Sequence, residues 1–186
     1  MTIAILALQG AFIEHENILK KLGANVVELR QAADLKQSYD GLVLPGGEST
    51  VQGKLLRELD MFDTLYKQIT DGMPVLATCA GMILLASEIE GKDEKHFATI
   101  PMCVRRNAYG RQLGSFHTDA EVSGIGTVPM TFIRAPYVAK TGDGVEVTAT
   151  VDDKIVGVKY GNQIAFSFHP ELDDDLRIHE AFLKMV

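Results

Sequence analysis

The chain has 186 residues, of which 46% are hydrophobic and 23% charged, and its formal net charge at pH 7 is −7. These proportions are typical of a soluble globular protein, and the acidic balance, with no cluster of Lys and Arg, disfavours nucleic acid as a partner. No apolar run is long enough for a membrane-spanning helix. We therefore expect a single domain, residues 1–186, that binds neither nucleic acid nor a membrane.

Cysteine usage points to a reducing compartment. Only Cys79 and Cys103 are present, and the N-terminal segment lacks the basic region of a secretory signal. We therefore expect a cytoplasmic protein with free thiols. Two cysteines are too few for a structural zinc site, and neither a metal nor another cofactor is expected.

The first half of the chain alternates short apolar runs with helical patterns. Runs that are typical of buried parallel strands cover residues 3–8, 25–29, 41–44 and 74–78. Helical patterns cover residues 11–22, 51–59, 61–70 and 80–87. This alternation predicts a three-layer α/β fold, in which a mostly parallel open sheet of the flavodoxin-like type is flanked by helices.

After Gly91 the pattern changes to strand-like segments with little helix between them. These segments cover residues 121–122, 130–133, 145–151, 155–159 and 163–168. Asp152-Asp153 is expected to form a hairpin turn, and residues 174–185 are expected to form a closing helix. No repeat or linker marks a second domain.

Cys79 lies where the fourth apolar run passes into a helical pattern. A cysteine attacks as the thiolate, and a helix N-terminus stabilises that anion. The small neighbours Ala77 and Gly81 suit a tight strand-to-helix elbow, in which the N–H of Ala80 would face a developing oxyanion. The alternative is a buried core cysteine without chemistry, and this stretch alone favours neither reading.

A glycine-rich loop, LPGGEST at residues 44–50, follows the third apolar run. Ligands of open α/β sheets bind at the carboxyl ends of strands, and Gly47 could supply a second oxyanion donor there. Taken alone, however, the loop is better explained as a simple turn in which Glu48 or Ser49 caps the next helix.

The segment FSFHPE, residues 166–171, places a histidine and an acid together after the last apolar run. A nucleophilic cysteine needs a base, and the base needs a group that orients it. Pro170 constrains the chain so that Glu171 can turn back toward the imidazole of His169. No chemistry is assigned to the other histidines, which are His15, His96, His117 and His179.

These three elements, in this order on an α/β pattern, resemble the class I (triad) glutamine amidotransferases. The resemblance covers nearly the whole chain, beginning with residues 6–11 (LALQGA). Two further segments, residues 106–112 (RNAYGRQ) and 132–136 (FIRAP), are similar to those that mark the glutaminase subunits of pyridoxal 5′-phosphate synthases.

The resemblance implies a role for each matching residue. Cys79 would be the nucleophile, His169 the general base and Glu171 the orienting acid, with Gly47 and Ala80 as oxyanion donors. The implied contacts to glutamine are Gly47, Glu48, Ser49, Arg106, Ile133 and Arg134. An acid and arginines suit the α-ammonium and α-carboxylate groups of that substrate.

The implied activity is hydrolysis of L-glutamine to glutamate and ammonia without a cofactor. The ammonia would pass to a separate, barrel-type synthase subunit in a hetero-oligomer that makes pyridoxal 5′-phosphate, the active form of vitamin B6. The alternative enzymes are a stand-alone γ-glutamyl or other cysteine hydrolase, and an amidotransferase subunit for another acceptor. The non-catalytic alternative is a flavodoxin-like binding module with an inert Cys79.

Overall fold

The computed structural model describes residues 1–106 and 114–186. Its strands are β1 (Thr2–Leu6), β2 (Asn25–Leu29), β3 (Gly41–Leu44), β4 (Val75–Thr78), β5 (Ala86–Ile89), β6 (Ile100–Arg105), β7 (Ser115–Val122), β8 (Gly126–Ile133), β9 (Tyr137–Thr141), β10 (Glu146–Val151), β11 (Lys154–Tyr160) and β12 (Gln163–Phe166). Its helices are α1 (Phe12–Lys21), α2 (Ser49–Glu58), α3 (Phe62–Thr70), α4 (Ala80–Leu85) and α5 (Arg177–Leu183), with short 3-10 turns η1 (Ala32–Lys36) and η2 (Pro170–Leu172). None of these described helices has the length and apolar character needed to cross a membrane.

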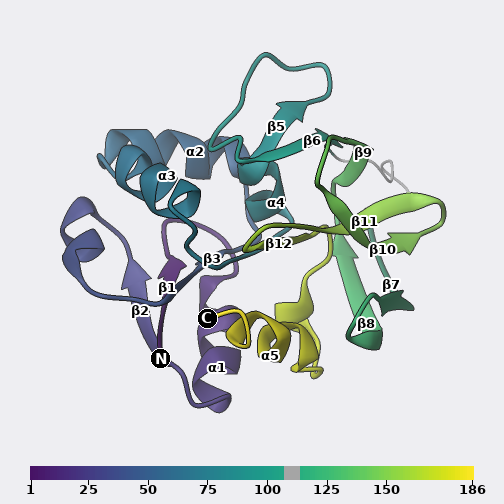
Figure 1. Ribbon diagram of the computed structural model, residues 1–186, viewed down its shortest axis with the longest axis horizontal. Coiled ribbons are helices and arrows are strands. Elements are labelled where there is room, and N and C mark those ends of the chain that lie inside the picture. The colour runs from purple at the N-terminus through teal and green to yellow at the C-terminus, as the bar shows by residue number, and fades with distance from the viewer. Residues whose placement is uncertain (107–113) are drawn as a thin grey trace.

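The strands form one sheet in the order β2-β1-β3-β4-β12-β11-β10-β7-β8, and β5, β6 and β9 join it beside β11 (Figure 1). From β2 to β12 all neighbours are parallel. Leu44 pairs with Ala77, and Thr78 pairs with Phe166, so β3, β4 and β12 end at the same edge. The loops that follow these three strands are therefore brought together.

Helices cover both faces of the parallel strands (Figure 1). Ala4 and Leu6 of β1 belong to the apolar cluster under α2, α3 and α4. Ile3 and Ile5 belong to the cluster under α1 and α5. Successive side chains of a strand point to opposite faces, so a strand between two helical layers must be apolar throughout. The predicted three-layer α/β fold with a mostly parallel open sheet is confirmed.

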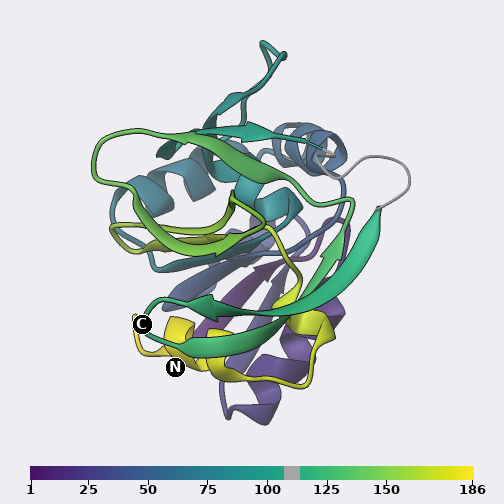
Figure 2. The ribbon, with the colours of Figure 1, turned by 90° about the vertical axis from the view of Figure 1, so that its right-hand side faces the viewer.

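The second half of the chain extends this sheet with antiparallel strands. β7 and β8 form a long hairpin that lies beside the C-terminal segment (Figure 2). The rings of Phe132 on β8 and Phe168 lie 5.8 Å apart between their centroids, and the amide of His169 donates to the carbonyl of Thr131 at 2.8 Å. The hairpin therefore fixes the start of the segment that carries His169.

Some expectations about individual elements were wrong. The helix expected over 80–87 ends at Leu85, because the next residues pair with β6 as strand β5. The closing helix is shorter than 174–185: α5 covers Arg177–Leu183, and just before it the carboxylate of Asp175 accepts the amide of Arg177. β6 and β9 were not predicted, and the strand expected at 121–122 is the end of the longer β7.

The hairpin turn at Asp152-Asp153 is confirmed between β10 and β11. Both residues have positive φ angles, 48° and 60°. Two such residues in succession produce the tight turn whose twist matches that of the flanking strands. Residues 107–112 of the segment RNAYGRQ, in contrast, lie outside the described residues.

Candidate active site

Cys79 occupies the sharp turn between β4 and α4. Its φ of 48° and ψ of −100° are unfavourable for a residue other than glycine, and its amide donates to the carbonyl of Phe166 at 2.8 Å. Gly81 lies directly against β3, where an added Cβ would lie 2.8 Å from the carbonyl carbon of Leu44. The geometry is therefore the small-residue elbow that the sequence predicts.

His169 and Glu171 are bonded to each other beside this elbow. Pro170 begins the turn η2 directly after His169, and the turn brings the Glu171 side chain back. Nδ1 of His169 lies 2.7 Å from Oε1 of Glu171, and both side chains are buried. This bond occupies Nδ1, so Nε2 is the ring nitrogen left for a reacting group.

Burial and hydrogen bonding compete at this pair. Burial alone would lower the pKa of His169, but its hydrogen bonds to Cys79 and Glu171 outweigh burial and raise that pKa to about 10. Burial alone would raise the pKa of Glu171, but the nearby His15 and the hydrogen bond from His169 hold it below its ordinary value. A carboxylate and an imidazolium are therefore favoured beside the thiol at neutral pH.

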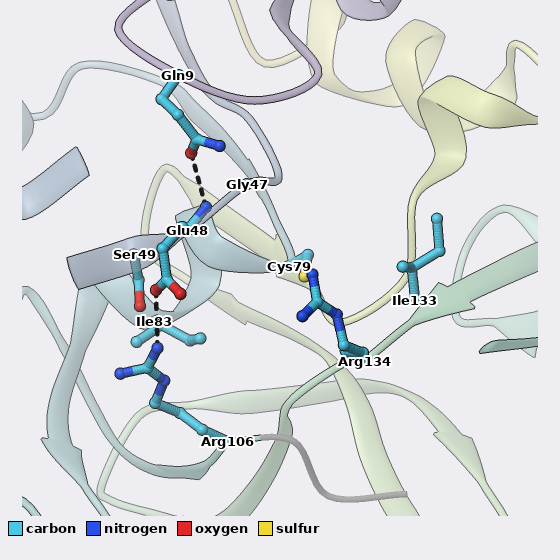
Figure 3. A pocket seen from close by; sticks show the side chains of 9 residues that line it. All are labelled: Gln9, Gly47, Glu48, Ser49, Cys79, Ile83, Arg106, Ile133 and Arg134. Carbon is cyan, nitrogen blue, oxygen red and sulfur yellow. Dashed lines mark hydrogen bonds and ion pairs between the residues drawn. The ribbon is translucent and has the colours of Figure 1, made fainter. Parts of the chain in front are cut away.

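A cavity of about 230 Å³ opens beside Cys79 (Figure 3). It is lined by Gln9, Gly47, Glu48, Ser49, Cys79, Ile83, Arg106, Ile133 and Arg134. This set contains all of the residues that the sequence analysis assigned to glutamine. Ala80 begins α4 next to the cavity and is buried. Gln9 and Ile83 were not assigned a role from the sequence.

One wall of the cavity is polar. The carboxylate of Glu48 accepts the amide of Thr50 at 3.2 Å and the guanidinium of Arg106 at 2.8 Å. The cap that the loop alone favoured is thus present, and the same side chain also lines the cavity. The hydroxyl of Ser49 is buried and has no hydrogen-bond partner within residues 1–106 and 114–186. Ser49 also lines the cavity.

The end of β8 supplies the other wall. Figure 3 shows Ile133 and Arg134 across the cavity from Glu48 and Arg106, with Cys79 between the two sides. Arg134 has a φ of 43°, and its backbone amide donates to the carbonyl of Gly114. An exposed guanidinium is thereby placed at the mouth of a cavity that also holds an acid.

The loop after β3 passes through a narrow space that only glycine fits. A Cβ on Gly46 would lie 2.8 Å from Nδ1 of His169. A Cβ on Gly47 would lie 3.0 Å from the side-chain amide nitrogen of Gln52. Both contacts are closer than real Cβ atoms normally make. The two glycines therefore let the loop backbone lie against the His169 ring on one side and the Gln9 and Gln52 side chains on the other.

Gln9, in the loop that follows β1, holds the Gly46-Gly47 loop in place. Its side-chain oxygen accepts the amide of Glu48 at 2.7 Å, and its carbonyl accepts the side-chain amide of Gln52 at 2.9 Å. The sequence carried a signal for this residue, because Gln9 follows the first parallel strand, at the edge where the other site loops meet.

His15 of α1 is a residue that sequence reasoning missed. Its Nε2 lies 3.4 Å from Oε2 of Glu171, and its side chain is completely buried. No local pattern marks this contact, because α1 and η2 are remote in the sequence. His15 thus lies beside Glu171 at the site, although no role was assigned to it from the sequence.

The second cysteine lies elsewhere. Cys103 is on β6, where burial and the nearby Glu88 and Glu90 raise the pKa of its thiol. Both cysteines are free. Within the part of the chain that the structure describes, no group of three or more His, Cys, Asp or Glu side chains could hold a metal ion.

Residues 5–186 match the model of the SNO glutamine amidotransferase family. The chain belongs to the SNO glutamine amidotransferase family. The match includes every residue that lines the cavity. The sequence-based assignment to the glutamine amidotransferases is confirmed.

Similar proteins of known name cover the whole chain. A protein called pyridoxal 5′-phosphate synthase subunit PdxT from Desulfitobacterium hafniense (strain Y51) is 59% identical over 186 residues, which are 100% of this chain and 94% of that protein. A protein of the same name from Streptococcus pneumoniae (strain ATCC 700669 / Spain 23F-1) is 53% identical over 188 residues, covering 100% of this chain and 97% of that protein.

Solved structures agree on the fold. A crystal structure described as a glutamine amidotransferase has a TM-score of 0.93 and 44% identity, and the match covers 98% of this chain and 97% of that one. The structure of PurLQS from Thermotoga maritima has a TM-score of 0.74 at 14% identity, with 98% and 97% of the two chains covered. The second likeness concerns the fold alone.

Proposed function

We propose that this chain is the glutamine-hydrolysing subunit of a pyridoxal 5′-phosphate synthase. It cleaves L-glutamine to glutamate and ammonia, and a separate synthase subunit uses the ammonia to make pyridoxal 5′-phosphate. Family membership and the names of the similar proteins support this proposal. The observation that carries it is the buried His169–Glu171 pair beside Cys79, at the wall of a polar cavity.

The first half of the reaction forms a thioester. The thiolate of Cys79 attacks the side-chain amide carbon of glutamine, and the carbonyl oxygen becomes an oxyanion. The backbone N–H groups of Gly47 and Ala80 bond this oxyanion. The imidazolium of His169 gives its Nε2 proton to the amide nitrogen, the carbon–nitrogen bond breaks, and ammonia leaves. Its raised pKa keeps His169 in the protonated form that this step needs.

The second half releases glutamate. Neutral His169 now takes a proton from water, and the hydroxide attacks the γ-glutamyl thioester. The carbon–sulfur bond breaks, which restores the thiolate and the imidazolium. Throughout, the carboxylate of Glu171 keeps the proton on Nδ1 and leaves Nε2 facing the reacting atoms, because Nδ1 is bonded to it at 2.7 Å.

Charged groups around the cavity suit the two ends of glutamine. Glu48 is an acid for the α-ammonium group, and Arg106 and Arg134 are cations for the α-carboxylate. Ser49 lines the same cavity, and its unpartnered hydroxyl is proposed as a further hydrogen-bonding group for glutamine. Ile133 contributes an apolar contact to the methylene groups between the two ends.

The synthase partner is of the barrel type, and the two subunits form a hetero-oligomer in the cytoplasm. This part of the proposal rests on the resemblance of the sequence to the glutaminase subunits of such enzymes. Residues 1–186 act as one domain, since the loops of the site come from strands spread over the whole chain.

Glutamate release from glutamine tests the proposal. The purified chain, mixed with a barrel-type synthase subunit from a similar protein's organism, should hydrolyse glutamine, and Cys79→Ala should abolish the hydrolysis. Cys103→Ala is the matched control and should retain it. Equal hydrolysis by wild type and Cys79→Ala would exclude the assigned nucleophile. No hydrolysis of glutamine alongside cleavage of γ-glutamyl peptides would favour a stand-alone hydrolase.

A further inference from the structure

A fully buried polar layer lies beneath the His169–Glu171 pair. It consists of His15 on α1, Thr78 at the end of β4 and His179 on α5, each with 0% exposure. Nδ1 of His15 lies 2.8 Å from Nε2 of His179, and Nε2 of His15 lies 3.1 Å from the hydroxyl of Thr78. Buried polar groups are costly unless they are paired, so an arrangement of this kind needs an explanation.

The hydroxyl of Thr78 is the centre of this layer. It accepts the amide of Gly46 at 3.0 Å, lies 3.5 Å from Oε1 of Glu171 and contacts Nε2 of His15. A hydroxyl has one hydrogen to donate and two lone pairs that accept. Because a carboxylate can only accept, the hydrogen goes to Glu171. The second lone pair must then accept from His15, which places a hydrogen on Nε2 of that ring.

The position of Glu171 requires the same tautomer. Its Oε2 has no hydrogen-bond partner in the described ranges, and Nε2 of His15 lies 3.4 Å from it. A bare nitrogen lone pair at that distance would repel the carboxylate, whereas an N–H directs its positive end toward it. Nδ1 of His15 is then an acceptor, and it receives its hydrogen from Nε2 of His179.

The opposite arrangement would leave a buried donor unpaired. If His15 donated from Nδ1, His179 would carry its hydrogen on its own Nδ1, which is buried and has no partner among residues 1–106 and 114–186. An unmade hydrogen bond from a buried N–H costs more than a bare nitrogen acceptor that stays unpaired. The chain of donation therefore runs from His179 to His15, from His15 to Thr78, and from Thr78 to Glu171.

Both histidines of this layer are neutral. Burial lowers the pKa of His15, and the nearby His169 lowers it further, against the opposing effects of Glu171 and Glu14. Burial and the neighbouring His15 lower the pKa of His179 to about 3, although Glu171 acts in the other direction. Of the three histidines around Glu171, His169 is therefore the one that is charged.

We propose that His15 and His179 are positioning residues, which act through Thr78 to orient the carboxylate of Glu171 toward His169 and to anchor the loop at Gly46. Thr78 directly precedes Cys79, and Gly46 directly precedes Gly47, so one hydroxyl links the nucleophile turn, the oxyanion loop and the orienting acid. The expected effect on the rate of glutamine hydrolysis rests on the proposed function, whereas the tautomers of His15 and His179 do not depend on it.

Nuclear magnetic resonance of the free chain tests the tautomers directly. Long-range nitrogen–proton spectra of the ¹⁵N-labelled protein distinguish the two neutral tautomers from the imidazolium. His15 and His179 should each show the neutral ring with hydrogen on Nε2 between about pH 6 and 8, where an ordinary histidine titrates. The signals are assigned by their loss in His15→Gln and His179→Leu. Hydrogen on Nδ1 of His15, or a charged ring at neutral pH, would overturn the proposal.

Kinetics of the complex with the synthase subunit test the effect on rate. His15→Asn removes the hydrogen at the Nε2 position, whereas His15→Gln retains an N–H there. His15→Asn should lower kcat for glutamine hydrolysis about 10- to 100-fold, the equivalent of one lost hydrogen bond to a charged group, with KM almost unchanged. His15→Gln should recover most of kcat. His96→Gln, a buried histidine outside the layer, is the control and should keep wild-type kinetics.

Two variants of Thr78 test the same role if the His15 variants do not fold. Thr78→Ser keeps the hydroxyl and should remain active, and Thr78→Val keeps the shape and should lose kcat as His15→Asn does. Unchanged kcat in His15→Asn and Thr78→Val, or a change confined to KM, would refute the positioning role. Absence of glutamine hydrolysis in the wild-type complex would instead refute the proposed function and leave the spectroscopic test intact.

Discussion

Cys79 and Cys103 are buried to a similar degree, with 7% and 6% exposure, but their sulfur atoms have opposite surroundings. Cys79 lines the cavity and is bonded to His169, whose pKa is raised, whereas burial and two glutamates raise the pKa of Cys103. Iodoacetamide at neutral pH should therefore alkylate Cys79 at least tenfold faster, because the thiolate is the nucleophile. Peptide mass spectrometry after limited reaction measures this ratio. Preferential labelling of Cys103 would contradict the assignment of the nucleophile.

Glu171 has a second measurable effect, through His169. Glu171→Gln replaces an anion by a neutral amide at the same position, so the pKa of His169 should fall below its value of about 10. We also expect kcat to fall by roughly 10²- to 10⁴-fold while glutamine binding persists, since the loss concerns the orientation of the ring. Titration of the His169 ring signals by nuclear magnetic resonance gives the pKa, and steady-state kinetics gives kcat. An unchanged pKa would mean that Glu171 does not act on His169.

The local part of the site could be predicted from the sequence. His169 and Glu171 are two positions apart, and a proline between them restricts the chain, so their contact follows from short-range geometry. His15 and His179 are 164 positions apart, and no periodic pattern fixes how α1 and α5 are rotated against each other. The polar layer therefore depends on tertiary contacts, and the sequence carries no local signal for it.

At the scale of elements, the close approach of α4 to β3 sets the position of Cys79. A Cβ at Gly81 would press on the backbone of Leu44, which cannot move as a flexible side chain would. Gly81→Ala should therefore reduce the free energy of unfolding by about 1–3 kcal/mol, as for other overpacked sites, and lower kcat as well. Urea unfolding measures the first effect. Gly114→Ala is the control for stability, because among the described residues its Cβ would meet only a side-chain atom of Arg134, at 3.8 Å.

Element prediction succeeded where burial on both faces left a clear pattern. The strand at 41–44 agrees with β3 at both ends, because a continuous apolar run of this length is typical of a central parallel strand. The strand at 25–29 also agrees with β2 at both ends, although β2 is the edge strand of the sheet and is only partly buried. The first residues of β5 were predicted to continue the preceding helix, because Ala86 is as compatible with a helix as with a strand. Their pairing with β6 is a tertiary contact that outweighs helix propensity.

At the scale of the whole molecule, the active site is at an edge of the sheet that also exposes apolar side chains. Ile13, Ile133 and Leu172 are 54%, 38% and 44% exposed, and all three lie close to the loops of the site. We propose that the synthase partner docks over this edge, because the proposed reaction releases ammonia there. Covering these side chains would provide part of the binding energy.

We predict that the chain alone is a poor glutaminase and that its partner activates it. The loop at Gly46-Gly47 can adopt backbone states closed to other residues, so the Gly47 amide can point away from the site until a contact turns it. One missing oxyanion donor reduces the rate by about 10²- to 10³-fold. Turnover at saturating glutamine, with and without excess synthase subunit, should differ by this factor. Equal turnover would exclude activation and favour a stand-alone hydrolase.

The central claim is that glutamine nitrogen released at Cys79 reaches pyridoxal 5′-phosphate. The most direct measurement supplies amide-¹⁵N-glutamine to the complex of this chain with the synthase subunit, together with a pentose phosphate and a triose phosphate, and analyses the product by mass spectrometry. The wild-type chain should give ¹⁵N-labelled pyridoxal 5′-phosphate, whereas Cys79→Ala should give none until ammonium salt is added. Unlabelled product from the wild-type complex, or labelled product from Cys79→Ala, would contradict the claim.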